Sequence, residues 1–220
     1  MTTPKTTKIE KLNRFTTLPF LFDMLLRKQL TLLNPDSWED YNDRITIKAY
    51  KNKVNAKSIY ALCLTHKSET VHHWNAFANG PSGCCIEFNY PKIKLLLDNR
   101  PNVRHSESEY IKVSSISTYS TDNFKALPFI KRLPFKPENE YRIIATSNNN
   151  QNPCFDIPIN LNIINKITLS NKLPEISFNS VRSALGKLQP TLLSKIHRST
   201  LYDNSTWVNY FSNLAQKNSS

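Results

Sequence analysis

Residues 58–65 restrict the fold more than any other stretch of this chain. Consecutive side chains of a strand point to opposite faces of a sheet, and in this stretch both faces are almost entirely apolar. A strand that is apolar on both faces is typical of a sheet covered on both sides. The stretch therefore predicts a central strand between two packed layers. One face would carry Ile59, Ala61, Cys63 and Thr65, and the other Tyr60, Leu62 and Leu64.

The rest of the chain mixes strand and helix patterns without strict alternation. Further strands are expected at 12–17, 30–33, 45–50, 83–88, 110–116, 138–146, 155–157 and 166–169. Helices are expected at about 19–29, 70–79, 91–99, 179–187, 190–198 and from 205 or 206 onward, with loops at 34–43 and 99–109. At 220 residues, the length favours one domain. The prediction is a flexible N-terminus at 1–11 and a single α+β domain at 12–215, with a mixed, largely antiparallel sheet, continuous or split, flanked by helices.

Glycine is scarce, with three residues in the whole chain. Glycine-rich phosphate loops of the Rossmann and Walker kinds need several glycines, because the backbone must come close to phosphate. The sequence therefore excludes nucleotide-binding folds that are built on those loops.

The chain has a formal charge of +12, and its basic residues are grouped. Between Asp43 and Glu69 there are six basic residues and no acid, and the stretches 123–137 and 176–202 are also free of acids. Such a charge distribution favours a polyanionic partner, so contact with nucleic acid is expected. The alternative is a soluble basic protein with no such partner.

Four cysteines are present, and none forms a Cys-x-x-Cys pair, so reduced, buried thiols are expected. The first eleven residues are polar and basic, which predicts no signal peptide. No window approaches about 18 consecutive apolar residues, so no transmembrane helix is expected. A cytoplasmic location without membrane contact is the prediction.

The stretch at 136–147 contains two acids immediately before and at the start of a strand pattern. Because side chains two apart share a face of a strand, Glu138, Glu140 and Arg142 would lie together. Two neighbouring carboxylates repel, so one would titrate abnormally unless a cation or ligand neutralises it. The structural alternative is a simple ion pair between Glu140 and Arg142 at a sheet edge.

Several segments follow one another along the chain: Tyr41-Asn42-Asp43, Trp74 with Phe77, Gly83, Glu87 with Phe88, and a Lys-rich stretch from Lys131 to the Glu-x-Glu-Tyr-Arg at 138–142. In this order they resemble the bacterial family known as domain of unknown function 2971. The resemblance covers about residues 12–170, with Arg44 where the family usually has Pro and Phe77 at the position of its usual Tyr. It implies a link with mobile elements and antiphage defence, and an antitoxin or other defence protein as partner.

A weaker similarity concerns ADP-ribosyltransferase-like toxins, in which a basic residue, a hydroxyl residue and Glu-x-Glu follow one another. Here the order is Arg14, Thr65 and then Glu138 and Glu140. The similarity implies an ADP-ribosyltransferase-like fold and mono-ADP-ribosyl transfer with NAD as substrate. Glu140 would bond a ribose hydroxyl and stabilise the oxocarbenium-like state, while Glu138 would orient the acceptor.

Other residues receive roles in the same hypothesis. Arg14 and Thr65 would contact NAD, Trp38 would hold its base or nicotinamide ring, and His73 would contact a ribose. Adjacent histidines point about 100° apart on a helix, so His72 and His73 are not expected to share a metal ion, and no metal site is predicted. Nucleic acid would be bound as substrate by Lys131, Arg132, Lys136 and Arg142.

Two other classes stay open at this point. One is a metal-dependent nuclease that uses Asp40, Asp43, Glu87 and Glu138 or Glu140 as ligands. The other is a non-catalytic nucleic-acid-binding module, in which the acids only form ion pairs with basic side chains.

Overall fold

The structure is a computed structural model, and it describes residues 11–118, 123–149 and 152–217. The flexible N-terminus predicted at 1–11 lies outside the described residues except for Lys11, which begins the first strand.

Strand β3 (Ser58–Thr65) is the centre of a nine-stranded sheet. On one edge, β8 (Glu140–Ser147) pairs with the whole length of β3, and β5 (Val103–Glu107) pairs with β8. On the other edge, β3 meets two strands, each at one residue pair. These strands are β1 (Lys11–Thr17), through Asn13 and Thr65, and β2 (Gln29–Leu33), through Leu33 and Ala61.

The two strands on this second edge lead into different parts of the sheet. Beyond β1 lie β4 (Gly83–Asn89), β10 (Ile164–Leu169) and β11 (Ile196–Arg198), whereas β9 (Cys154–Pro158) lies beyond β2. The sheet therefore splits at β3. Pairing is antiparallel except between β10 and β11 and in the separate ribbon of β6 (Glu109–Ile111) and β7 (Ile130–Arg132). The mixed, largely antiparallel sheet predicted from the sequence is confirmed.

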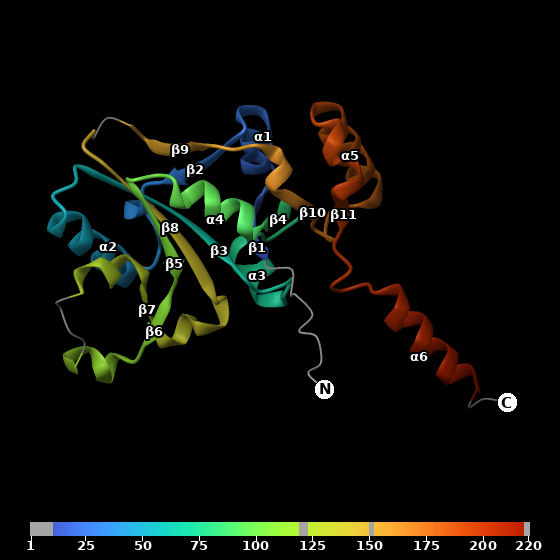
Figure 1. The fold of residues 1–220 in the computed structure, drawn as a ribbon. Helices are drawn as coiled ribbons and strands as arrows, with labels where there is room; N and C mark the ends of the chain where they lie inside the picture. Colours follow the sequence, from blue (N-terminus) through green and yellow to red (C-terminus); the bar gives the residue numbers. More distant parts are fainter. Residues whose placement is uncertain (1–10, 119–122, 150–151, 218–220) are drawn as a thin grey trace, which may run out of the picture.

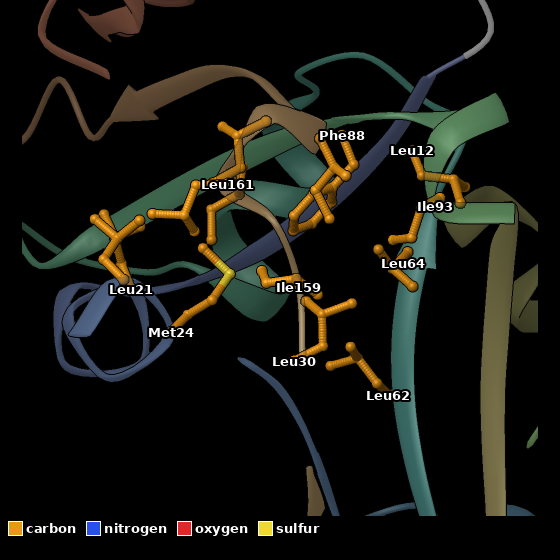
Figure 2. Packing of buried hydrophobic residues seen from close by; sticks show 14 of the residues in the cluster. Leu12, Leu21, Met24, Leu30, Leu62, Leu64, Phe88, Ile93, Ile159 and Leu161 are labelled. Atoms are coloured by element: carbon orange, nitrogen blue, oxygen red, sulfur yellow. The ribbon is translucent and has the colours of Figure 1, made fainter. Parts of the chain in front are cut away.

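Helices cover both faces of the sheet (Figure 1). Helices α1 (Leu18–Arg27), α4 (Tyr90–Asp98) and α5 (Glu175–Leu188) contribute to the larger core, together with Leu62 and Leu64 of β3 (Figure 2). On the opposite face, α2 (Tyr41–Lys53) packs against Ile59 and Ala61 of β3, and α3 (Val71–Phe77) packs against β1 and β4. Burial of both faces of β3 confirms the prediction for residues 58–65.

Four expected elements are wrong. Residues 45–50 lie inside α2, because Asp43, Ile47 and Tyr50 are buried at helical spacing and the side chain of Asp40 caps the helix by accepting from the Asn42 N–H. The loop expected at 99–109 contains the edge strand β5. The strand expected at 110–116 is only the end of β6, and 190–195 is a 3₁₀ turn that leads into β11.

The last helix, α6 (Ser205–Lys217), extends away from the sheet and the other helices (Figure 1). Trp207, Tyr210, Phe211 and Leu214, its expected apolar stripe, are exposed. Among the residues that the structure describes, no helix has the length and apolar character needed to cross a membrane.

Candidate functional site

A cavity of about 520 Å³ lies where β1 and β2 diverge from β3. Residues 62–64 of β3 face this gap without a strand partner on that edge among the described residues. The wall also includes the ends of α1, α2 and α3 and the segment before β8. Its members include Arg14, Phe15, Phe20, Trp38, Asp43, Cys63, Thr65, His73, Phe77, Lys131, Phe135, Glu138 and Glu140.

A buried cluster of three carboxylates and two cations lies at one end of the cavity, and all of its members except Arg142 line the wall. Lys131 Nζ donates to Glu138 and, at 2.9 Å, to Glu140, and it lies 3.7 Å from Asp43. Arg142 donates its Nε to Glu140 and an Nη to Asp43 at 2.9 Å. With three carboxylates ionised, the cluster has one negative charge in excess.

The fold positions Glu138 through its own backbone. The 3₁₀ turn Leu133–Glu138 ends at Asn139, which adopts a left-handed conformation with φ of 44°, and Asn tolerates this better than most residues. The Glu138 carbonyl accepts from Thr65 Oγ1 at 2.8 Å and from His73 Nε2 at 2.9 Å. Thr65 and His73 therefore hold the turn that presents Glu138, and their polar atoms are committed to protein partners.

His73 is neutral in this arrangement. Burial lowers the pKa of His73, and its Nδ1 lies 2.7 Å from the hydroxyl of Thr70. With Nε2–H donating to a carbonyl, Nδ1 is left to accept from Thr70. The ring centre of His73 lies 5.1 Å from that of Phe15, and both residues line the cavity.

The two glutamates differ in electrostatic state. Burial alone would raise the pKa of Glu140, but the guanidinium of Arg142 and the ammonium of Lys131 outweigh it and lower the pKa to about 2. Burial raises the pKa of Glu138, because Lys131 compensates only in part and two other carboxylates are near. Both oxygens of Glu140 are bonded to cations, whereas Glu138 has one oxygen with no hydrogen bond from any described residue.

Arg14 contributes an unpartnered guanidinium to the other part of the wall. Its exposed fraction is 7%, and it makes no hydrogen bond or ion pair with any residue that the structure describes. Burial lowers the pKa of Arg14. A buried cation without a partner is costly, so this position is suited to an anionic ligand.

Cys63 also lines the cavity and lies near both Arg14 and Glu140. Burial raises the pKa of Cys63 well above its usual range, so the thiol stays protonated. Nothing in the sequence distinguished this cysteine from the other buried thiols.

Aromatic rings form much of the remaining wall. Trp38 is half-buried, and the guanidinium carbon of Arg142 lies 5.2 Å from its ring centre. Trp38 was predicted as a site residue from the sequence. Four other aromatic residues that line the cavity were not, namely Phe15, Phe20, Phe77 and Phe135. Their convergence depends on how the strands diverge, and no local pattern signals it.

Some residues predicted for the site lie elsewhere. Arg142 is fully buried and does not line the cavity, and among the described residues it donates only to Glu140, Asp43 and the Pro128 carbonyl, so its predicted substrate contact is wrong. Arg132 and Lys136 lie outside the cavity wall. Glu87, a ligand in the nuclease hypothesis, pairs with Lys11 at 3.0 Å on β4 and is not part of the cavity wall.

No family model, no curated protein and no solved structure matches this chain. Within the described part of the chain, no group of three or more His, Cys, Asp or Glu side chains is arranged to hold a metal ion. The residues of the cavity are therefore the basis for its chemical role.

The low pKa of Glu140 predicts how acid affects stability. The pKa of this carboxyl falls from about 4.5 to about 2 on folding, so the ionised group stabilises the folded protein fully at pH values above about 4.5. This stabilisation is lost as the pH falls towards 2. We expect Glu140→Gln to lower the free energy of unfolding by about 3 kcal/mol at neutral pH. The difference from the wild type should shrink as the pH drops from 4.5 to 2.

Urea denaturation at a series of pH values measures this difference. Glu109→Gln, an exposed substitution on β6 with no ion pair to a described residue, is the matched control and should show little effect at any pH. A Glu140→Gln deficit that does not change with pH would show that the carboxylate charge is not the cause.

Proposed function

We propose that the protein transfers a single ADP-ribosyl group from NAD to an acceptor, and that the reaction takes place in the cavity at the split of the sheet. The observation that supports this most is an unpartnered guanidinium, Arg14, in the same cavity as a carboxylate with one unbonded oxygen, Glu138. A volume of about 520 Å³ lies within the range of small-molecule sites.

The charges of the cavity are opposite to the charges of the two parts of NAD that would lie beside them. A guanidinium binds phosphate oxygens through two parallel hydrogen bonds, so Arg14 suits the pyrophosphate of NAD. The excess negative charge of the carboxylate cluster suits the cationic nicotinamide ring and the positive charge that develops on the ribose. Aromatic walls such as Trp38 and Phe135 suit flat rings.

The chemical step involves two reactants, NAD and the acceptor. The bond between ribose C1′ and the nicotinamide nitrogen breaks, and its electron pair leaves with nicotinamide, which becomes neutral. The oxocarbenium-like C1′ is stabilised by the adjacent carboxylate and is attacked by a nucleophilic oxygen or nitrogen of the acceptor. That atom loses a proton to the carboxylate base as the new bond forms.

The geometry supports Glu138 rather than Glu140 as this carboxylate. Glu140 has both oxygens bonded to Lys131 and Arg142 and a pKa of about 2, so it is a poor proton acceptor. Glu138 has a raised pKa and an unbonded oxygen, as a general base requires. Glu140 then acts as a positioning residue that anchors Lys131.

The alternatives receive less support. Among the acids proposed for a nuclease, Glu87 is paired with Lys11 outside the cavity wall, and the oxygens of Glu140 already bind an ammonium and a guanidinium. The resemblance to defence-associated families supports a toxin or antiphage role for the transferase, with a neutralising protein as partner.

Incubation with NAD labelled in the adenylate part, together with RNA, DNA and protein acceptors, tests the proposal. We expect label transfer with release of one nicotinamide per label. Metal-dependent cleavage of nucleic acid without label transfer would support the nuclease. Nucleic-acid binding without any turnover of NAD would support the non-catalytic module.

A further inference from the structure

We infer that single-stranded nucleic acid is the acceptor, and that it is bound by a surface at the mouth of the cavity, which we call the mouth surface. Its members are Tyr41, Arg44, Arg132, Phe135 and Lys136, and Lys48 and Lys51 continue the face of α2 that begins at Arg44. The role as acceptor rests on the proposed function, whereas the binding itself does not require NAD.

The mouth surface adjoins the cavity through shared residues. Phe135 lines the cavity, and the guanidinium of Arg132 lies 5.3 Å from its ring centre. Arg132 also acts electrostatically on Asp40, another residue of the cavity wall. Arg44 donates to the Asp36 carbonyl at 3.0 Å, in the segment that leads to Trp38.

Two arginines of the mouth surface combine an aromatic neighbour with an unused donor. Arg44 lies over the ring of Tyr41, at 5.1 Å, and Tyr41 has an exposed fraction of 63%. Of the two Nη groups of Arg44, one donates to the Asp36 carbonyl, and neither Nη group of Arg132 has a hydrogen-bond partner among the described residues. Free guanidinium donors of this kind favour a ligand that accepts hydrogen bonds, as phosphate does.

The charge around these arginines is mainly positive. Arg44, Lys48 and Lys51 recur at the spacing of one face of α2, and Lys136 is exposed on the turn before Glu138. The acids nearby are Asp36, Glu39 and Asp40, and the last of these is used to cap α2. The rings beside these cations are the exposed Tyr41 and the half-buried Phe135. Positive charge interleaved with accessible rings is the pattern by which proteins bind single strands.

A single strand fits better than a duplex because of the position of the reacting carboxylate. Glu138 has an exposed fraction of 7% and lies in the cavity wall, so an acceptor atom must enter the cavity to reach it. A base inside a duplex cannot do so without leaving the stack, whereas an unpaired base can. An acidic protein would match the charge but not the aromatic rings.

Fluorescence anisotropy without NAD tests the binding. The probes are a labelled mixed-sequence single strand of about twelve nucleotides, as DNA and as RNA, a hairpin duplex with the same number of phosphates, and poly-glutamate as competitor. If about four phosphates are neutralised, affinity for the single strand should fall about 50-fold between about 50 and 200 mM KCl. The duplex should bind about 10-fold more weakly than the single strand, since its bases cannot stack on the rings.

Two double variants locate the surface. Arg44→Gln with Arg132→Gln should weaken single-strand binding about 10-fold or more and reduce the salt slope by about 1.4. Lys92→Gln with Lys187→Gln removes the same charge from exposed positions on α4 and α5 and should change affinity by less than about 3-fold. Equal losses in both variants, equal binding of the duplex, or displacement of the strand by poly-glutamate would each overturn the inference.

The same assay separates this inference from the proposed function. If the strand binds as expected but never receives label from NAD, the transferase fails and the binding surface stands. If NAD is consumed while the strand does not bind, the transferase stands and this acceptor is wrong.

Discussion

Glu138→Gln should lower the rate of nicotinamide release from NAD by about 10²–10³-fold and leave the protein folded. The amide keeps the size of the side chain but removes the charge that stabilises the oxocarbenium-like state and the base that takes the acceptor proton. Burial raises the pKa of Glu138, so its ionised form contributes less to stability than that of Glu140. Chromatographic measurement of nicotinamide, beside a thermal unfolding curve for each variant, gives both quantities.

Two further variants serve as controls for this result. Glu140→Gln should lose activity and stability together, because it breaks the bonds to Lys131 and Arg142. Glu87→Gln changes a carboxylate outside the cavity and should keep turnover within about 2-fold of the wild type, in line with surface substitutions away from the site. Turnover by Glu138→Gln close to that of the wild type would rule out Glu138 as the reacting carboxylate.

Arg14→Met should weaken NAD binding by about 100-fold and at the same time stabilise the protein without ligand by about 1–3 kcal/mol. The loss of affinity follows from the removal of two charge-assisted hydrogen bonds to phosphate. The gain in stability follows because a buried guanidinium with no partner is replaced by an apolar chain of similar length. Calorimetric titration with NAD and urea denaturation measure the two effects.

Arg14→Lys is the matched variant, because it keeps the positive charge and removes the planar pair of donors. It should bind NAD with an affinity between those of the wild type and Arg14→Met. If Arg14→Met instead destabilises the protein and binds NAD as well as the wild type does, then Arg14 is a structural residue.

The central strand could be predicted from the sequence because the local pattern of apolar residues determines its place in the sheet. Residues 58–65 are apolar on both faces, and this pattern fits only a strand in the middle of the sheet. In contrast, Ile45 and Ile47 favour a strand by their side-chain shape, yet the cap at Asp40 and the burial of Asp43 and Ile47 produce a helix. Strand β5 is polar and pairs only with β8, so its sequence carries no alternation to detect.

Part of the site could also be predicted, because local spacing along a strand determines which side chains share a face. The two-residue spacing placed Glu140 and Arg142 on one face of β8, and they do lie together, although in the interior of the sheet rather than at an edge. That Arg14 and Glu140 line one cavity was proposed from the order of the residues along the chain, and both do line it. Which glutamate has an unbonded oxygen depends on Lys131, and only the folded structure shows that contact.

The crystal structure of the protein with carba-NAD, an analogue that cannot release nicotinamide, tests the central claim most directly. We expect the pyrophosphate on the guanidinium of Arg14 and the nicotinamide ribose next to the carboxylate of Glu138, with rings against the aromatic wall. An analogue bound elsewhere on the protein, or an empty cavity at saturating analogue, would contradict the account.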